Sequence, residues 1–281
     1  MQTTGLNRDT IDKFYTNPIV SKECCDIIKQ FININNEIDI IIEPSAGNGS
    51  FIPELLNMSL NCLFYDIRPE NIAIVKQDYL CIDIQNIELP DINSKIHIIG
   101  NPPFGRQSSL AIKFIKKSAE FCDTISFILP KSFKKDSMIK HFPLQFHLVY
   151  QCDLNDKSFL VDGVEHNVET VFQIWEKKDH NRTPIIKKES VGFTFVKQDE
   201  NPDISFRRVG VNAGKIYTNN LQDKSIQSHY FIKFNDTIDK KNIIDKISNI
   251  IYDDNNTVGP KSISKQEIIK EFNKLFTCDA L

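Results

Sequence analysis

Short apolar runs alternate with amphipathic stretches from Ser21 to Lys140, and this alternation strongly limits the folds open to the chain. Asp39–Ile42 is a continuous, β-branched run of the kind found in strands buried on both faces of a parallel sheet. Ser21–Phe31 has apolar residues at helical spacing, with Ser21 as the expected N-cap. Further strands are predicted over Cys62–Ile67, Ile72–Val75, Ile96–Ile99 and Thr124–Leu129, and further helices over Phe51–Leu60 and Ser108–Phe121. The pattern predicts a doubly wound α/β sheet with helices on both faces.

The alternation changes after Pro143. Phe146–Cys152 and Val168–Trp175 are two strand-like runs that are joined by a polar loop, with no helix between them. Such a pair predicts a hairpin, so we expect the sheet to end with an antiparallel strand.

A polar segment, Asp179–Pro184, reads as a linker between two domains, residues 1–178 and residues 179–281. The second is expected to be a small α+β region. Its predicted elements are strands over Val191–Val196 and Ile204–Val211 and a closing amphipathic helix over Ser264–Phe276.

Composition places the chain among intracellular globular proteins, cytoplasmic or nucleoid-associated. It has 281 residues, of which 41% are hydrophobic and 25% charged. No apolar run has the length of a membrane span, and the start of the chain lacks a signal peptide's apolar region, so no membrane association is expected. The seven cysteines form no C-x-x-C pair, which favours reduced thiols and no metal site.

Positive charge is concentrated in two stretches, although the net charge is -3. Asn101–His141 carries eight Lys or Arg against three acids, and Ile204–Lys233 carries five against one. Such stretches suit contact with nucleic acid phosphates, although solvated helix faces would give the same composition.

A glycine loop follows the strand Asp39–Ile42, in the order Glu43-Pro44-Ser45-Ala46-Gly47-Asn48-Gly49-Ser50-Phe51. Glycines at this point let the backbone approach a ligand closely. A dinucleotide site would need a third small residue, glycine or alanine, three positions after Gly49. That position is occupied by Ile52. The loop therefore favours S-adenosylmethionine (SAM), which has no phosphate, over a nicotinamide cofactor. A plain turn between strand and helix is the alternative.

Two acidic positions follow the next strands. Asp66 ends the strand Cys62–Ile67, where its carboxylate can accept hydrogen bonds from two ribose hydroxyls. The alternative for Asp66 is an acid at a helix N-terminus. Asp78 is expected to accept a hydrogen bond from the cofactor's adenine amine, and Tyr79 to pack on the adenine ring.

The motif Asn101-Pro102-Pro103-Phe104 follows the predicted strand Ile96–Ile99 and Gly100. Its residue types suit the binding of a flat amino group. The Asn101 side-chain oxygen and the Pro102 carbonyl can accept both N–H bonds of such a group, which frees its lone pair. The prolines remove competing N–H donors, and Phe104 offers a face for stacking a base. Alternatively, the two prolines only terminate the strand.

These motifs, in this order, resemble the class I SAM-dependent amino methyltransferases, and most of all the adenine-N6 DNA methyltransferases of the gamma arrangement. In that group a segment similar to Phe14-Tyr15-Thr16-Asn17-Pro18 precedes the glycine loop. The resemblance covers about Asp12 to Trp175. It implies a Rossmann-like, seven-stranded sheet with an antiparallel last strand. It also implies a SAM site formed by Phe14, Tyr15, Thr16, Glu43, Ala46, Gly47, Phe51, Asp66, Asp78 and Tyr79, and catalysis by Asn101, Pro102, Pro103 and Phe104.

The expected function is therefore SAM-dependent adenine-N6 methylation of nucleic acid, with the base flipped into the pocket. DNA is favoured by the segment Phe14–Pro18, and RNA is the alternative polymer. Guanine-N2 and protein glutamine-N5 methylation use the same tetrapeptide, and a catalytically silent, nucleic-acid-binding partner is a further alternative. Two assignments stay open. Phosphate contacts or a structural β-cap are the two possible roles for Arg207, Arg208, Asn212 and Lys215. Phe159 is either a side chain that stacks on the base or a buried anchor.

Overall fold

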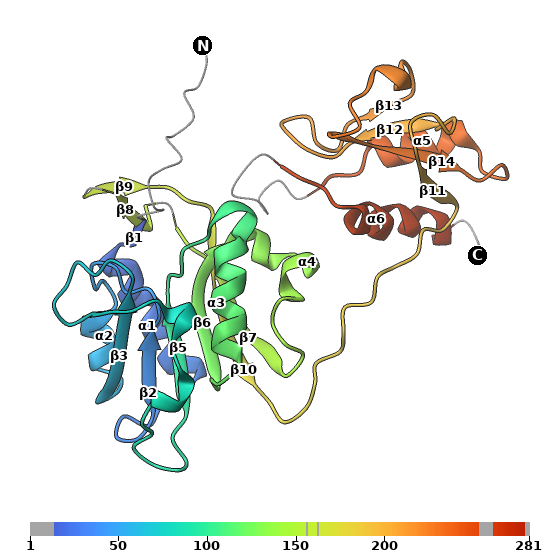
Figure 1. Cartoon of the computed structure of the whole chain (residues 1–281). Coiled ribbons are helices and arrows are strands. Elements are labelled where there is room, and N and C mark those ends of the chain that lie inside the picture. The colour runs from blue at the N-terminus through green and yellow to red at the C-terminus, as the bar shows by residue number, and fades with distance from the viewer. Residues whose placement is uncertain (1–13, 156, 162, 253–260, 279–281) are drawn as a thin grey trace. The chain divides into compact units, whose positions relative to one another are not determined.

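The computed structural model describes residues 14–155, 157–161, 163–252 and 261–278. The chain divides into two compact units between Pro184 and Ile185 (Figure 1). The whole segment expected to be a linker, Asp179–Pro184, belongs to the first unit. There Arg182 donates hydrogen bonds to the carbonyls of Phe142 and Phe146, at 2.9 and 3.1 Å. These bonds fix the segment to the first unit.

A mixed sheet of seven strands forms the centre of the first unit. Its order is β4 (Val75–Lys76), β3 (Asn61–Asp66), β2 (Ile40–Glu43), β5 (Ile96–Gly100), β6 (Thr124–Pro130), β10 (Thr170–Lys177) and β7 (Phe146–Asp153). The last of these along the chain, β10, is antiparallel to both of its neighbours, β6 and β7. The β2–β3, β2–β5, β3–β4 and β5–β6 pairs are parallel. This confirms the predicted Rossmann-like methyltransferase sheet with its antiparallel last strand.

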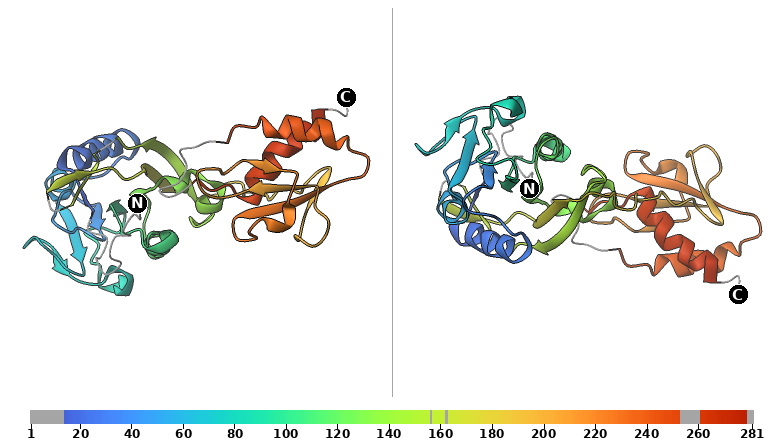
Figure 2. Two further views of the ribbon diagram at one scale, coloured as in Figure 1. Left: turned by 90° about the horizontal axis from the view of Figure 1, so that it is seen from above. Right: turned by 90° about the horizontal axis from the view of Figure 1, so that it is seen from below.

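Helices cover both faces of the sheet (Figures 1 and 2). On one face, α1 (Pro18–Phe31) and α2 (Ile52–Leu56) bury residues such as Cys24 and Leu55 against Ile41 of β2. On the other face, α3 (Ser109–Ala119) and the short α4 (Asp136–Ile139) contribute side chains to the apolar cluster that contains Ile42 and Ile98. The continuous apolar run of β2 is therefore used on both sides, as its sequence predicts.

The first two helices differ from prediction at their ends. Helix α1 begins at Pro18, because the side chain of Asn17 accepts a hydrogen bond from the Ile19 N–H at 3.0 Å. Ser21, the expected cap, is a buried residue inside the helix. Helix α2 is only five residues long. After it the chain turns, and the Ser59 hydroxyl donates to the Asp39 carbonyl at 2.7 Å.

The loop between β7 and β10 forms a small hairpin that the sequence did not predict. Its strands are β8 (Phe159–Val161) and β9 (Val164–His166), and β8 pairs with the short strand β1 (Tyr15–Thr16). Phe159 is fully buried in this arrangement. It is therefore a buried anchor, which was one of its two predicted roles.

In its described residues, the second unit has a four-stranded antiparallel sheet and two α-helices. The strand order is β11 (Phe193–Val196), β14 (His229–Phe234), β12 (Ile204–Arg207) and β13 (Ile216–Tyr217), and the helices are α5 (Lys240–Ser248) and α6 (Lys265–Cys278). Its core combines isoleucine side chains with aromatic ones, among them Phe193, Phe206, Phe234 and Phe272. The predicted α+β character is present, although the sequence did not predict β13, β14 or α5.

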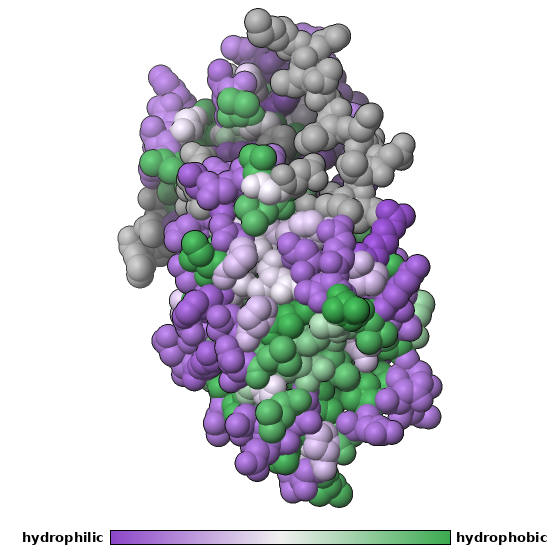
Figure 3. All heavy atoms as spheres, turned by 90° about the vertical axis from the view of Figure 1, so that its left-hand side faces the viewer, coloured by the Kyte–Doolittle hydropathy of each residue, from purple (hydrophilic) through white to green (hydrophobic). Residues whose placement is uncertain are grey.

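Apolar side chains gather in one area of the first unit, on the side that carries α2 and β3 (Figure 3). Leu56 and Leu60, in and just after α2, are exposed by 53% and 75%. Exposed apolar residues are ordinary on protein surfaces, so this area gives no functional assignment. Among the described residues, no helix has the length and apolar character needed to cross a membrane.

Candidate active site

The carboxyl ends of neighbouring parallel strands bring the predicted site residues together. Glu43 ends β2, Asp66 ends β3, and Asn101 follows β5. A small cavity of about 30 Å³ lies at this edge. It is lined by Phe14, Tyr15, Thr16, Glu43, Ser45, Ala46, Gly47, Asn48, Ser50, Phe51 and Asn101. Seven of the ten predicted cofactor residues and the central catalytic candidate therefore share one cavity.

The segment before α1 closes one side of this cavity. Thr16 pairs with Phe159 of β8, and the backbone N–H of Asn17 donates to the Ser158 carbonyl at 2.9 Å. The Phe14 ring meets the Phe159 ring edge-on, with 6.3 Å between the centroids. The hairpin β8–β9 thus holds residues 14–16 beside the glycine loop, although it lies about 140 residues away along the chain.

Gly47 in the glycine loop has φ of +54°, a conformation that favours glycine. A Cβ at this position would lie 2.8 Å from a ring carbon of Tyr15. The Gly47 N–H donates to one carboxylate oxygen of Asp66 at 2.8 Å. The loop therefore needs glycine for its backbone conformation and for the close approach of Tyr15.

Asp66 accepts two backbone hydrogen bonds, from the N–H groups of Gly47 at 2.8 Å and Arg68 at 2.7 Å. Each oxygen accepts one of them, which leaves a second lone pair on each for another donor. Asp66 thus fixes the glycine loop and keeps acceptor capacity at the end of β3. The pairing of Asp66 with the loop was not predicted, because sequence gives no signal for it.

Glu43 is a buried carboxyl group without a complete set of partners. Its side chain is 2% exposed, and Oε2 has no hydrogen-bond partner among the described residues. Burial, with a smaller contribution from the negative charge of Asp66, raises the pKa of Glu43 to about 8. An unpartnered carboxyl group that faces a cavity is suited to a cationic ligand group, such as an ammonium.

Asp66, Asp78 and Tyr79 are not among the residues that line the cavity. Tyr79 does not match its predicted role. The Tyr79 ring is 1% exposed and stacks on Phe114 of α3 at 5.5 Å. Its hydroxyl lies 2.8 Å from the Ser118 hydroxyl, and burial raises the pKa of Tyr79 above its usual range. Because the ring is part of the core, it cannot pack on a bound adenine. Asp78 is exposed and accepts the Leu80 N–H at 2.9 Å.

Asn101 is held in a defined orientation. Its side-chain Nδ2 donates to the Phe14 carbonyl at 3.1 Å, and its own carbonyl accepts from the Ser45 hydroxyl at 3.1 Å. Because the Phe14 carbonyl can only accept, Nδ2 must be the atom that faces it, and Oδ1 is left as the acceptor. The structure thus links the Phe14–Thr16 segment directly to the Asn-Pro-Pro-Phe motif.

The rest of the motif is anchored by the chain that follows it. The Phe104 carbonyl accepts from the N–H groups of Leu110 and Ala111, and Pro102 is buried while Phe104 is partly exposed. Gln107 and Ser108 have φ of 53° and 61°, the left-handed region that non-glycine residues rarely adopt. Such conformations cluster at functional sites, and the sequence alone did not reveal them.

Part of the basic stretch Asn101–His141 is neutralised within the first unit. Lys131 Nζ lies 3.0 Å from a carboxylate oxygen of Glu169 and 3.3 Å from one of Asp153. Lys134 Nζ lies 2.9 Å from the other oxygen of Asp153. These two lysines therefore contribute less positive charge to a binding surface than the sequence count implies.

Solved structures with a similar fold are distant from this chain. A proposed RNA methyltransferase from Pyrococcus horikoshii is 16% identical, with a TM-score of 0.42 over 62% of this chain and 93% of that chain. The 23S rRNA methyltransferase ErmE is 13% identical, with a TM-score of 0.43 over 60% and 71%. A proposed methyltransferase from Streptococcus mutans, in complex with SAH, is 16% identical, with a TM-score of 0.36 over 58% and 98%.

No curated protein matches the chain significantly. A match to a protein family is found for residues 36–185, which is just over half of the chain and includes Glu43, Asp66 and the Asn-Pro-Pro-Phe motif. The family is described as the EDM2 methyltransferase-like domain. The match begins shortly before β2 and ends just after the first unit, so it covers all seven strands of the central sheet. The chain therefore belongs to the EDM2 methyltransferase-like domain family.

Proposed function

We propose that this protein is a SAM-dependent methyltransferase that acts on the N6 amino group of adenine in nucleic acid, with DNA favoured over RNA. The observation that carries the proposal is the meeting of Glu43 and Asn101 at one cavity. One group is suited to a cationic cofactor and the other to an amino group that is to be methylated.

The cavity residues fit the amino-acid end of SAM. The unpartnered Oε2 of Glu43 would pair with the cofactor's ammonium group. Gly47 and Ala46 provide backbone without bulk, and the remaining acceptor capacity of Asp66 would take ribose hydroxyls. When bound, SAM supplies the methyl group on a positively charged sulfonium, so the protein needs no strong base of its own.

Entry of the cofactor requires a local movement. The present cavity of about 30 Å³ has room for about one water molecule. Tyr15 lies directly on Gly47, and Phe14 accepts the hydrogen bond from Asn101. We therefore expect residues 14–16 to move outward as SAM enters and to close over it afterwards.

Asn101 would act on the target amine through its acceptor atom. An exocyclic amino group on an aromatic ring is a poor nucleophile, because its lone pair is delocalised. Hydrogen bonds from its two hydrogens to Asn101 Oδ1 and the Pro102 carbonyl would favour a geometry in which the lone pair is available. Because Nδ2 is engaged by Phe14, Oδ1 is oriented before the substrate arrives. Phe104, partly exposed, would stack on the base.

Two alternatives are less well supported. A catalytically silent partner would have no need for an oriented Asn101 or an unpartnered buried Glu43. Methylation of a protein glutamine would have no use for the basic stretches at Asn101–His141 and Ile204–Lys233. DNA is placed ahead of RNA because the segment Phe14–Pro18 precedes the glycine loop, as in the DNA methyltransferases that the chain resembles.

Paired oligonucleotides test the proposal. Methyl transfer from SAM is measured on single- and double-stranded DNA and RNA that contain adenine. The matched substrates carry purine, which lacks the N6 amino group, at every adenine position. The proposal predicts transfer only to adenine. Equal labelling of the purine substrates, or no calorimetric binding of SAM, would contradict it.

A further inference from the structure

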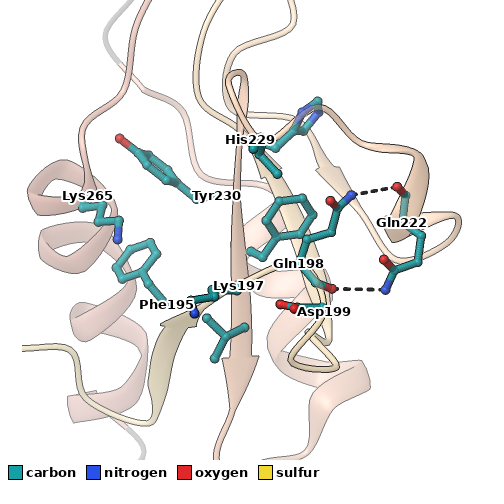
Figure 4. A pocket seen from close by; sticks show the side chains of 11 residues that line it. Phe195, Lys197, Gln198, Asp199, Gln222, His229, Tyr230 and Lys265 are labelled. Carbon is teal, nitrogen blue, oxygen red and sulfur yellow. Dashed lines mark hydrogen bonds between the residues drawn. The ribbon is translucent and has the colours of Figure 1, made fainter.

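The second unit contains a hollow of about 520 Å³ at the end of strand β11 (Figure 4). It is lined by Phe195, Val196, Lys197, Gln198, Asp199, Gln222, Ile226, His229, Tyr230, Phe231 and Lys265. Its size is typical of small-ligand sites. The methyltransferase chemistry described above uses none of these residues.

Two aromatic rings and an ammonium form one side of the hollow. The rings of Phe195 and Tyr230 meet edge-on, with 5.7 Å between their centroids. Lys265 Nζ lies 4.6 Å from the Phe195 centroid and 5.6 Å from the Tyr230 centroid. Figure 4 shows Lys265 reaching from the start of α6 towards both rings. Both rings are partly exposed, so a ligand can reach them.

The opposite side of the hollow is held by paired glutamines. Gln198 Nε2 donates to the carbonyls of Leu221, Gln222 and Lys224, at 3.0, 2.8 and 2.8 Å. Gln222 Nε2 donates in return to the Gln198 carbonyl at 3.1 Å (Figure 4). This wall is formed before any ligand binds, which lowers the entropy cost of binding.

Cations outnumber acids around the rings. The lining of the hollow includes two lysines, Lys197 and Lys265, and one acidic residue, Asp199. The guanidinium of Arg208 adds a third positive charge, 5.3 Å from the Tyr230 centroid. The ligand is therefore expected to combine a flat group that stacks on the rings with a negative charge near Lys265.

We propose that this hollow binds an unpaired nucleobase of single-stranded nucleic acid. The base would stack on the face of one of the two rings, Phe195 or Tyr230, and meet the other edge-on, because the ring planes are 74° apart. Lys265 would turn to the adjacent phosphate. Displacing the ammonium from the rings costs about two- to fivefold in affinity, whereas stacking a base contributes about five- to 150-fold. The exchange therefore favours the base, even before the phosphate contact is counted. The inference rests on the proposed action on nucleic acid and identifies its substrate class as one with unpaired bases.

A double helix does not meet these requirements, because its bases are stacked and paired and cannot enter the hollow. An acidic peptide would satisfy Lys197 and Lys265 and leave the aromatic rings unused. Base stacking is the feature that separates these ligands.

Fluorescence anisotropy of the full chain tests the proposal, with labelled oligo-dT and oligo-U, which contain no adenine, and a labelled duplex. Phe195→Leu and Tyr230→Leu keep apolar bulk and remove a ring, and each should weaken single-strand binding about five- to 100-fold. Lys265→Ala should reduce the slope of log affinity against log salt by about 0.7. Lys270→Ala, which changes another exposed lysine of α6, is the matched control and should change the affinity little.

Several results would overturn this assignment: no single-strand binding by the unaltered protein, ring variants that bind as it does, or competition by polyglutamate equal to that by oligo-dT. The assay also separates the two proposals. Normal methyl transfer with unchanged binding by the ring variants would reject the hollow alone. Loss of binding by the ring variants, in a protein that transfers no methyl group, would reject the proposed function alone.

Discussion

Glu43→Gln should stabilise the protein and abolish SAM binding. The buried Glu43 side chain has a pKa of about 8, against 4.5 for an ordinary glutamate. The folded state therefore holds a neutral carboxylic acid at neutral pH, whereas the unfolded chain holds a carboxylate. Ionisation in the unfolded chain favours unfolding, and glutamine, which cannot ionise, removes that effect.

The size of the effect follows from the pKa difference. Each pH unit above 4.5 stabilises the unfolded wild-type chain by about 1.4 kcal/mol, until Glu43 also ionises in the folded protein near pH 8. Because the pKa of Glu43 is raised in the folded protein, the wild type and the variant should have the same free energy of unfolding below about pH 4.5. As the pH rises above 4.5, the wild type should become progressively less stable than the variant. The difference should reach about 3 kcal/mol at pH 7 and about 5 kcal/mol at pH 8, and then stay constant.

The single tryptophan of the chain makes the measurement specific. Trp175 is 1% exposed and stacks on Phe142 at 4.0 Å, within the core of the first unit. Urea unfolding followed by tryptophan fluorescence therefore reports on the methyltransferase unit. Glu54→Gln, which changes a partly exposed carboxylate of α2, is the control for the change in charge.

Two results would refute the reasoning about Glu43. One is a stability difference between wild type and Glu43→Gln that stays constant from pH 4.5 to pH 8. The other is a Glu43→Gln variant that binds SAM as the wild type does. A more stable protein that has lost its cofactor is expected only if the unpartnered carboxyl group is reserved for a cation.

Three further changes test the site. Asn101→Ala should lower the rate of methyl transfer by about a hundredfold or more, with SAM affinity by calorimetry nearly unchanged; wild-type turnover would show that Asn101 is not catalytic. Asp66→Ala should weaken SAM binding first, because it removes the acceptor for ribose and frees the Gly47 N–H, and unchanged affinity would exclude that role. Gly47→Ala should also weaken SAM binding, since its Cβ would lie 2.8 Å from the Tyr15 ring, whereas Gly163→Ala, with φ of +77° and no atom within 4 Å, should leave binding intact. Equal effects of the two glycine changes would mean that backbone strain, and not the contact with Tyr15, is responsible.

Local sequence patterns were sufficient to predict the central sheet and the motifs at its edge. The β-branched run of β2 and the strand before Asn101 have few alternatives to a buried parallel strand, and both candidate-site motifs follow such strands directly. The carboxyl ends of neighbouring parallel strands lie at one edge, so Glu43 and Asn101 could be expected to lie close together.

The features that sequence did not reveal depend on tertiary contacts. The strand pairing of β8 with Tyr15–Thr16 joins residues far apart in the chain, and each strand is too short to give a pattern. Tyr79 follows a strand, in a position where the sequence predicts a ligand contact. In the structure its ring stacks on Phe114 of α3 and its hydroxyl is hydrogen-bonded to Ser118. Gln107 follows Phe104 in a left-handed conformation that its residue type does not predict.

The measurement that tests the proposed activity most directly is transfer of a tritiated methyl group from SAM to separate pools of DNA, RNA and protein, followed by nucleoside analysis. The proposed chemistry predicts that label appears as N6-methyladenine in nucleic acid, in DNA first, and that Asn101→Ala removes it. Label in protein, on another base, or undiminished in the Asn101→Ala variant would contradict it.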